Sequence, residues 1–215
     1  MPNLPGWNDV ETVELGGDFK RLPAGAYVAC LGPMTAETAK SGKTYYQCVF
    51  DIFEGEHKGH YDDDFGRKHP GLHAVKLYVS SEKAMGISKG TLNAITESNG
   101  GFDAEAAFVG DRFEDFRGKL VGVVLGEEEY EDRKTGDTKL SLTVRRCVPA
   151  SEARSGKISV PDVKTLDGDF VPAAEYERPE SKGGGTVQTS VAAHPADPSA
   201  PPAAPGSVYA ADVPF

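Results

Sequence analysis

The sequence predicts a mainly β fold, in which a small five-stranded barrel with one short helix is followed by a disordered C-terminal tail. Three observations lead to this prediction. Runs rich in aromatic and β-branched residues alternate with turn signals up to about residue 150. One helical pattern lies between the third and fourth of these runs. From residue 173 onward, a chain rich in proline, alanine and glycine lacks the apolar residues that a core requires.

Three strands are predicted in the first half of the barrel. Residues 25–31 (GAYVACL) form the first, directly after Leu22-Pro23. Residues 44–53 (TYYQCVFDIF) are the strongest strand pattern, because aromatic and β-favouring residues dominate them. Residues 72–79 (LHAVKLYV) form the third.

The helix and two further strands complete the predicted domain. Residues 88–98 read as a short helix that the glycines of 99–101 (NGG) end. Residues 119–125 (KLVGVVL) and 139–148 (KLSLTVRRCV) are strands joined by a charged loop at 131–137. Three strands, a helix and two strands is the element order of an OB-fold, a partly open Greek-key barrel. Five short strands would also fit another small barrel or an open sheet.

Alternation along the strands sorts their side chains between two faces, because successive residues of a strand point in opposite directions. The predicted inward set is Tyr46, Cys48, Phe50, Ile52, Val75, Leu77, Val79, Leu140, Leu142 and Val144. The predicted outward set is Tyr45, Gln47, Val49, Asp51, Ala74, Lys76, Tyr78, Lys139, Ser141, Thr143 and Arg145.

The outward face of the second and third strands, with the loops beside it, is where an OB-fold binds oligonucleotides. Aromatic rings for stacking bases and cations for phosphates are what sequence-tolerant binding of a single strand requires. The candidate nucleic-acid contacts are Lys43, Tyr45, Gln47, Lys76, Tyr78, Tyr130, Arg133, Lys134, Lys139 and Arg145. Tyrosine and lysine are equally at home on the solvent face of a strand that binds nothing.

The net charge opposes nucleic-acid binding. The chain has 23 Lys and Arg against 33 Asp and Glu, and its net charge is −10. A negative field slows the approach of a polyanion, so only local clustering of cations would overcome it.

The chain is predicted to have three parts, which are a domain, a linker and a tip. Residues 1–150 form the predicted domain, which residues 158–166 would extend to about residue 172 if they pack against it. Residues 173–208 are a predicted disordered linker. Residues 209–215 (YAADVPF) form an apolar tip that a linker cannot bury, so a partner protein is expected to bind it.

Catalytic and metal-binding patterns are weak. Cys30, Cys48 and Cys147 lack ligand spacing, which favours reduced thiols in a cytosolic protein. No secretory signal or membrane span is predicted. Four histidines (His57, His60, His69 and His73) accompany the acidic residues 62–64, but their spacing matches no zinc module. A solvated loop is the preferred interpretation, so we expect no enzyme, metal or cofactor. A metal-dependent nuclease using Asp51, Glu54 and Glu56 is an alternative.

The tip residues Asp212, Val213, Pro214 and Phe215 resemble the C-terminal tip of bacterial single-stranded DNA-binding proteins. That family ends in acidic residues followed by an aliphatic residue, proline and phenylalanine. The resemblance implies docking of replication or recombination enzymes. This chain departs from the pattern in having Ala210 and Ala211 where further acids are usual, so the aromatic terminus would provide most of the docking energy.

The body of the chain resembles phage-encoded single-stranded DNA-binding proteins. The residues that carry this resemblance are Gly6-Trp7, residues 22–27 (LPAGAY), Ser41-Gly42-Lys43, Phe50-Asp51-Ile52, Glu54-Gly55, Glu97-Ser98-Asn99 and Gly118-Lys119. The resemblance implies an OB-fold that binds DNA in the host cytoplasm without catalysis. An exposed barrel edge would allow a homodimer. A protein-only adaptor with the same barrel and tip is a further alternative.

Overall fold

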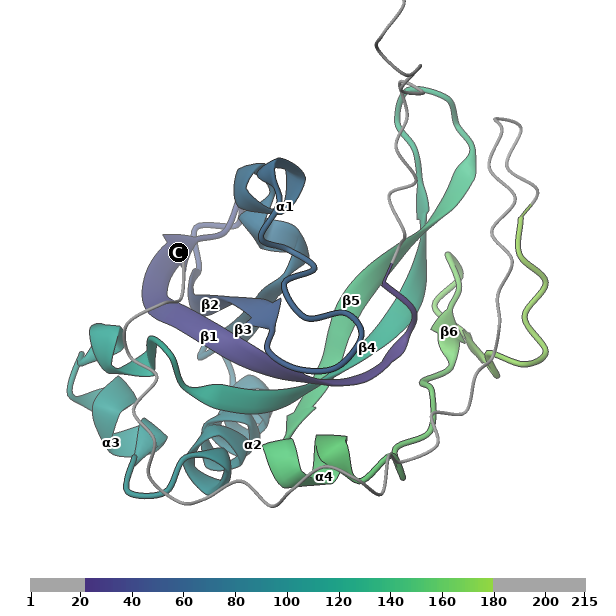
Figure 1. Ribbon diagram of the computed structural model, residues 1–215. Coiled ribbons are helices and arrows are strands. Elements are labelled where there is room, and N and C mark those ends of the chain that lie inside the picture. The colour runs from purple at the N-terminus through teal and green to yellow at the C-terminus, as the bar shows by residue number, and fades with distance from the viewer. Residues whose placement is uncertain (1–21, 180–215) are drawn as a thin grey trace, which may run out of the picture.

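The computed structural model describes residues 22–179, which form a curved seven-stranded sheet with helices on both faces (Figure 1). The strands are β1 (Gly25–Thr38), β2 (Thr44–Ile52), β3 (Ala74–Tyr78), β4 (Leu120–Glu131), β5 (Thr138–Val148), β6 (Val163–Lys164) and β7 (Phe170–Val171). Their order is β3-β2-β1-β4-β6-β7, and β5 pairs with β4. All contacts are antiparallel except β4–β6.

The predicted mainly β fold is confirmed, but the sheet differs from a five-stranded barrel. It has seven strands and is not closed, since β3 and β5 do not pair among residues 22–179. The two extra strands come from the segment after residue 155, where β6 pairs with β4 through Glu128 and Lys164. β1 pairs with β4 only as far as Leu125, so β6 occupies the edge of β4 that β1 leaves. Residues 158–166 therefore do contribute to the sheet.

Two strands are longer than the sequence patterns indicate. β1 continues past Gly32-Pro33 to Thr38, and its register with β2 shifts between Leu31 and Met34. Such a bulge lets a strand absorb residues that break regular pairing, and it bends the strand. β4 runs through three consecutive glutamates to Glu131, and the β4–β5 hairpin extends away from the body as an arm (Figure 1).

The structure contains more helix than the sequence patterns predict. Helix α2 (Glu82–Ser98) begins six residues before the predicted start, because the Ser81 hydroxyl caps it by accepting the Ala84 N–H at 3.2 Å. Its predicted end is confirmed. Further elements are α1 (Asp64–Lys68), α3 (Ala104–Val109), α4 (Ala150–Arg154) and the 3-10 helices Pro70–Leu72 and Phe113–Phe116. No helix within residues 22–179 is long and apolar enough to cross a membrane.

The main core lies between the inner face of the sheet and helices α2 and α3. Cys48, Phe50 and Ile52 of β2 are at most 2% exposed, which confirms the predicted alternation there. Val75 and Leu77 of β3 join them, whereas Ala74, predicted to face outward, is also buried. A smaller cluster on the opposite face lies beneath α4 and contains Val28, Val124, Val148, Ala150 and Ala153. Packing on both faces therefore holds the sheet in place beneath its remaining outer surface.

Candidate nucleic-acid interface

The solvent face of β2 and β3 brings together four of the predicted contact residues. Their register pairs Tyr45 with Tyr78 and Gln47 with Lys76. These four residues, which we call the tyrosine face, lie on the opposite side of the two strands from buried Cys48 and Leu77. The arrangement follows from strand geometry, because cross-strand partners on one face lie about 5 Å apart.

The two tyrosine rings of this face stack on each other. Their centroids are 5.6 Å apart and their planes differ by 27°. Tyr78 remains 46% exposed. Its backbone is anchored by Ser88 of α2, whose hydroxyl accepts the Tyr78 N–H and donates to the Tyr78 carbonyl, both at 2.9 Å. The helix therefore fixes the strand end that presents the ring.

Basic side chains flank the tyrosine face and are available to a ligand. Lys76 is exposed beside Tyr78, and Lys43 is exposed in the turn before β2. That turn is tight, because the Ala39 N–H donates to the Lys43 carbonyl at 2.9 Å. Within residues 22–179 neither lysine has an ion-pair partner. Both ammonium groups can thus approach a phosphate without giving up a carboxylate.

The other five predicted contacts lie on the β4–β5 arm and are placed differently. Tyr130 and Lys139 are register partners, and Tyr130 is 41% exposed. The Lys139 ammonium, however, lies 2.5 Å from the Asp132 carboxylate. This hydrogen bond raises the pKa of Lys139 and lowers the pKa of Asp132. Arg133 and Lys134 are exposed in the loop at the end of the arm.

Arg145, the last predicted contact, is bound to the protein's own acids. Its guanidinium donates to the Glu127 carbonyl oxygen at 2.5 Å and lies 3.6 Å from the Glu128 carboxylate. Only 18% of its side chain is exposed. A phosphate at Arg145 would have to compete with these partners.

A segment that the sequence patterns did not single out wraps the three glutamates of β4. Arg178 binds the Glu127 carboxylate with two hydrogen bonds of 3.1 and 2.8 Å. Lys164 lies 2.6 Å from Glu128, and the Tyr176 hydroxyl donates to Glu129. Burial and this bond to Glu129 raise the pKa of Tyr176. We call residues 161–178 the strap; its last six residues fall in the predicted linker.

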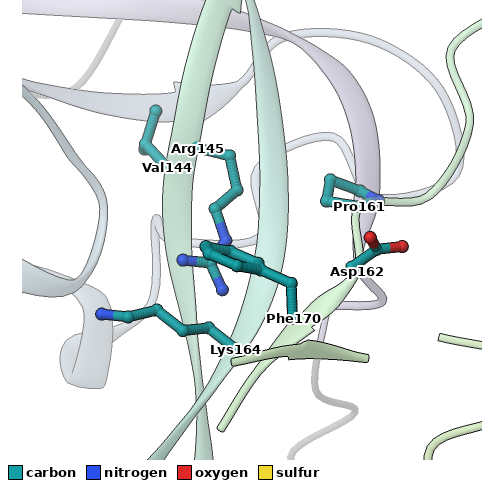
Figure 2. Close-up of a pocket in the computed structure, with 6 residues that line it drawn as sticks. All are labelled: Val144, Arg145, Pro161, Asp162, Lys164 and Phe170. Atoms are coloured by element: carbon teal, nitrogen blue, oxygen red, sulfur yellow. The ribbon is translucent and has the colours of Figure 1, made fainter. Parts of the chain in front are cut away.

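A pocket of about 520 Å³ lies between β5 and the strap. Figure 2 shows its lining side chains, which are Val144, Arg145, Pro161, Asp162, Lys164 and Phe170. The Phe170 ring is 60% exposed and lies over the Arg145 guanidinium at 5.8 Å. Sequence patterns indicated only Arg145 of this group as a ligand contact, and Val144 as an inward residue of its strand. Pro161, Asp162 and Lys164 lie in residues 158–166, which were predicted only as an extended segment that could pack against the domain, and Phe170 lies beyond that segment.

The histidine-rich loop is less solvated than predicted. His73 is 4% exposed, and its two ring nitrogens lie 2.5 Å from the Phe50 carbonyl oxygen and 3.1 Å from that of Gly66. Its ring stacks on Tyr61 at 4.4 Å. Burial and the neighbouring His57 lower the pKa of His60. In the part of the chain that the structure describes, no three acidic, histidine or cysteine side chains are arranged to hold a metal ion.

The predicted tip, Asp212 to Phe215, lies outside the described residues. No family model matches the chain, and no curated protein matches it.

Proposed function

We propose that this protein binds single-stranded DNA on the tyrosine face, without strong sequence preference. The observation that carries the proposal is the stacked pair of Tyr45 and Tyr78 beside Lys76, whose ammonium forms no ion pair in the described part of the chain. Each base that stacks on an aromatic ring contributes roughly 1–3 kcal/mol, and every base has such a face. Stacking on tyrosine therefore binds any sequence, while Lys43 and Lys76 attract the phosphates.

The strand arrangement supports an OB-type framework for this site. Leaving out the two short strap strands, β1 is central and joins β2–β3 on one side to β4–β5 on the other. Helix α2 lies between β3 and β4 in the chain. An OB-fold is a partly open barrel that binds oligonucleotides on its second and third strands, and that is where the tyrosine face lies.

The distribution of charge reconciles DNA binding with a net charge of −10. Two of the acids of β4 are paired with cations, since Glu127 binds Arg178 and Glu128 binds Lys164, and Glu129 accepts a hydrogen bond from the Tyr176 hydroxyl. By contrast, Lys76 of the tyrosine face and Lys43 in the turn before β2 form no ion pair within residues 22–179. Local attraction for a single strand can therefore exist on a protein whose overall field opposes the approach of a polyanion.

The proposed biological role is that of a phage-type single-stranded DNA-binding protein. It would cover single strands during replication or recombination, and its terminal residues 212–215 would recruit an enzyme of the same process. The tip resemblance and the aromatic face support these two parts independently. In this role the chain performs no catalysis and requires no cofactor.

A titration tests the proposal against its alternatives. Labelled oligo-dT of twenty nucleotides and the matching duplex are titrated with the full chain at 50 and 200 mM salt, with and without magnesium. We expect binding that prefers the single strand and weakens as salt increases, with no cleavage. Magnesium-dependent cleavage would instead support a nuclease. A chain that binds neither DNA would contradict the proposal and favour a protein-only adaptor.

A further inference from the structure

The pocket between β5 and the strap contains an exposed aromatic ring, Phe170, that packs against an arginine side chain. Phe170 belongs to β7, and its pairing with Lys164 of β6 fixes its backbone. One face of its ring lies over the Arg145 guanidinium, as Figure 2 shows, and 60% of the residue is exposed. A phenylalanine held this way cannot bury its outer face within residues 22–179. A flat apolar surface is therefore left for a ligand.

The cation behind this ring is rigid. Arg145 is held by the Glu127 carbonyl and by Glu128, and its Nε atom is buried without a hydrogen-bond partner among the described residues. Its side chain lies flat over Gly126, where a Cβ atom would come within 2.6 Å of Nε. Because these contacts already hold the Arg145 side chain, stacking a ligand on Phe170 costs little further side-chain entropy at Arg145.

We propose that this pocket binds a nucleobase of single-stranded DNA, stacked on the outer face of Phe170. The inference rests on the proposed function and assigns a second contact point for the same strand. Arg145 then supports the ring rather than binding phosphate. Lys164 at the pocket rim has 36% of its side chain exposed and is paired with Glu128 at 2.6 Å, so a phosphate adjoining the stacked base would share this ammonium with that carboxylate.

The lining favours a base over an apolar peptide side chain. Arg145, Asp162 and Lys164 make half of the six lining residues charged, so an apolar side chain would find few apolar walls. A base needs only one ring face and exposes its polar edges to water. Stacking of bases on an aromatic platform beside cations is the general mode of single-strand binding.

The two contact points lie near opposite ends of β1. Tyr45 pairs with Glu37, whereas Gly126, beneath Arg145, follows the residue that pairs with Gly25. Twelve residues of strand span at most about 40 Å, and the curvature of β1 in Figure 1 shortens this. A single strand of roughly 4–16 nucleotides is the usual site size of one OB-type domain. One twenty-nucleotide strand is therefore expected to reach both points.

Ring-specific substitutions test the pocket. In the full chain, Phe170→Leu keeps apolar bulk but removes the ring, and Phe170→Tyr keeps the ring. We expect Phe170→Leu to weaken binding of twenty-nucleotide oligo-dT about tenfold. Phe170→Tyr should stay within about twofold of the unsubstituted chain. Leu166, on the same strap but outside the pocket, is 51% exposed, so Leu166→Ala is the matched control and should have no effect.

A fluorescent reporter makes the result independent of affinity. Trp7 is the single tryptophan, so Trp7→Phe with Phe170→Trp places the only indole in the pocket. Its emission should fall over the same range of oligo-dT concentration in which the DNA is bound. Unfolding midpoints in urea confirm that each variant is folded.

Three outcomes would overturn the inference, and they are distinguishable. If Tyr78→Ala weakens binding but Phe170→Leu and the indole reporter show no response, the pocket proposal alone fails. If the unsubstituted chain binds no single-stranded DNA, the proposed function fails with it. If the reporter changes without DNA when residues 209–215 are deleted, the chain's own terminal segment occupies the pocket.

Discussion

The tyrosine face and the β4–β5 arm carry the same kinds of residue, yet their basic side chains are paired to different extents. Lys43 and Lys76, at the first, have no ion-pair partner within residues 22–179. On the arm, Lys139 is bound to Asp132 and Arg145 to Glu128. A count of basic residues alone would favour the arm, which has Arg133, Lys134, Lys139 and Arg145 among its predicted contacts. Their pairing indicates that both lysines of the first region are free to bind phosphate, whereas two of the four basic side chains of the arm are engaged by acids of the arm itself.

The largest expected effect is on DNA binding when the tyrosine face loses its rings. Changing Tyr45 and Tyr78 together to alanine should weaken binding of oligo-dT at least tenfold, because each stacked base contributes about 1–3 kcal/mol. Fluorescence anisotropy with a labelled oligonucleotide measures the loss. Tyr130→Ala on the arm is the matched control, since Tyr130 is 41% and Tyr78 46% exposed. A greater loss from Tyr130→Ala than from the double substitution would reverse the comparison.

This contrast also shows which parts of the site were predictable. Alternation along β2 and β3 placed Tyr45, Gln47, Lys76 and Tyr78 on one face, because side-chain direction in a strand depends only on local geometry. The partners of Glu127 and Glu128 could not be predicted. They depend on a strap that returns to β4 from more than thirty residues away in the chain, through Lys164 and Arg178.

The same limit explains the errors in the fold. The sequence pattern predicted that β1 ends before Gly32-Pro33, whereas pairing with β2 continues the strand through a bulge. His73 was grouped with a solvated loop because three other histidines and the acidic residues 62–64 precede it. Its burial comes from contacts with Tyr61 and with the carbonyls of Phe50 and Gly66. Each missed feature depends on residues distant in the sequence.

A second prediction concerns stability and should affect only the arm side. Glu127→Gln removes the carboxylate that Arg178 binds with two hydrogen bonds, and Glu127 is 7% exposed. Because Arg178 is 40% exposed and can return to water, we expect a loss of about 1–2 kcal/mol in the free energy of unfolding. Urea unfolding measures it. Lys76→Gln, which breaks no pair, should change stability by less than about 0.5 kcal/mol. Equal losses would show that the two regions are not distinguished by pairing.

A smaller effect is expected on the salt dependence of binding. Each phosphate contact contributes about one to the slope of log affinity against log salt concentration, so Lys76→Gln should reduce the slope by about one. Lys139→Gln should reduce it by less than half as much, because the Lys139 ammonium is bound to Asp132. Anisotropy titrations between 50 and 200 mM salt provide both slopes. A larger change for Lys139→Gln would mean that DNA displaces Asp132 and that the arm is a primary contact.

The smallest expected effect comes from removing Phe215 alone. If the terminal residue serves only to dock a partner protein, its deletion should change the affinity for oligo-dT by less than twofold. The deletion removes no net charge, because the α-carboxylate passes to Pro214, so any change reports the aromatic ring rather than electrostatics. An increase in affinity would mean that the terminal ring competes with bases for an aromatic surface. Substitutions at the tyrosine face and at Phe170 would show which surface it occupies. Competition at the tyrosine face would disappear in the Tyr45→Ala, Tyr78→Ala background, whereas competition at Phe170 would persist there and disappear with Phe170→Leu. The deletion therefore distinguishes an independent tip from one that occupies either aromatic surface.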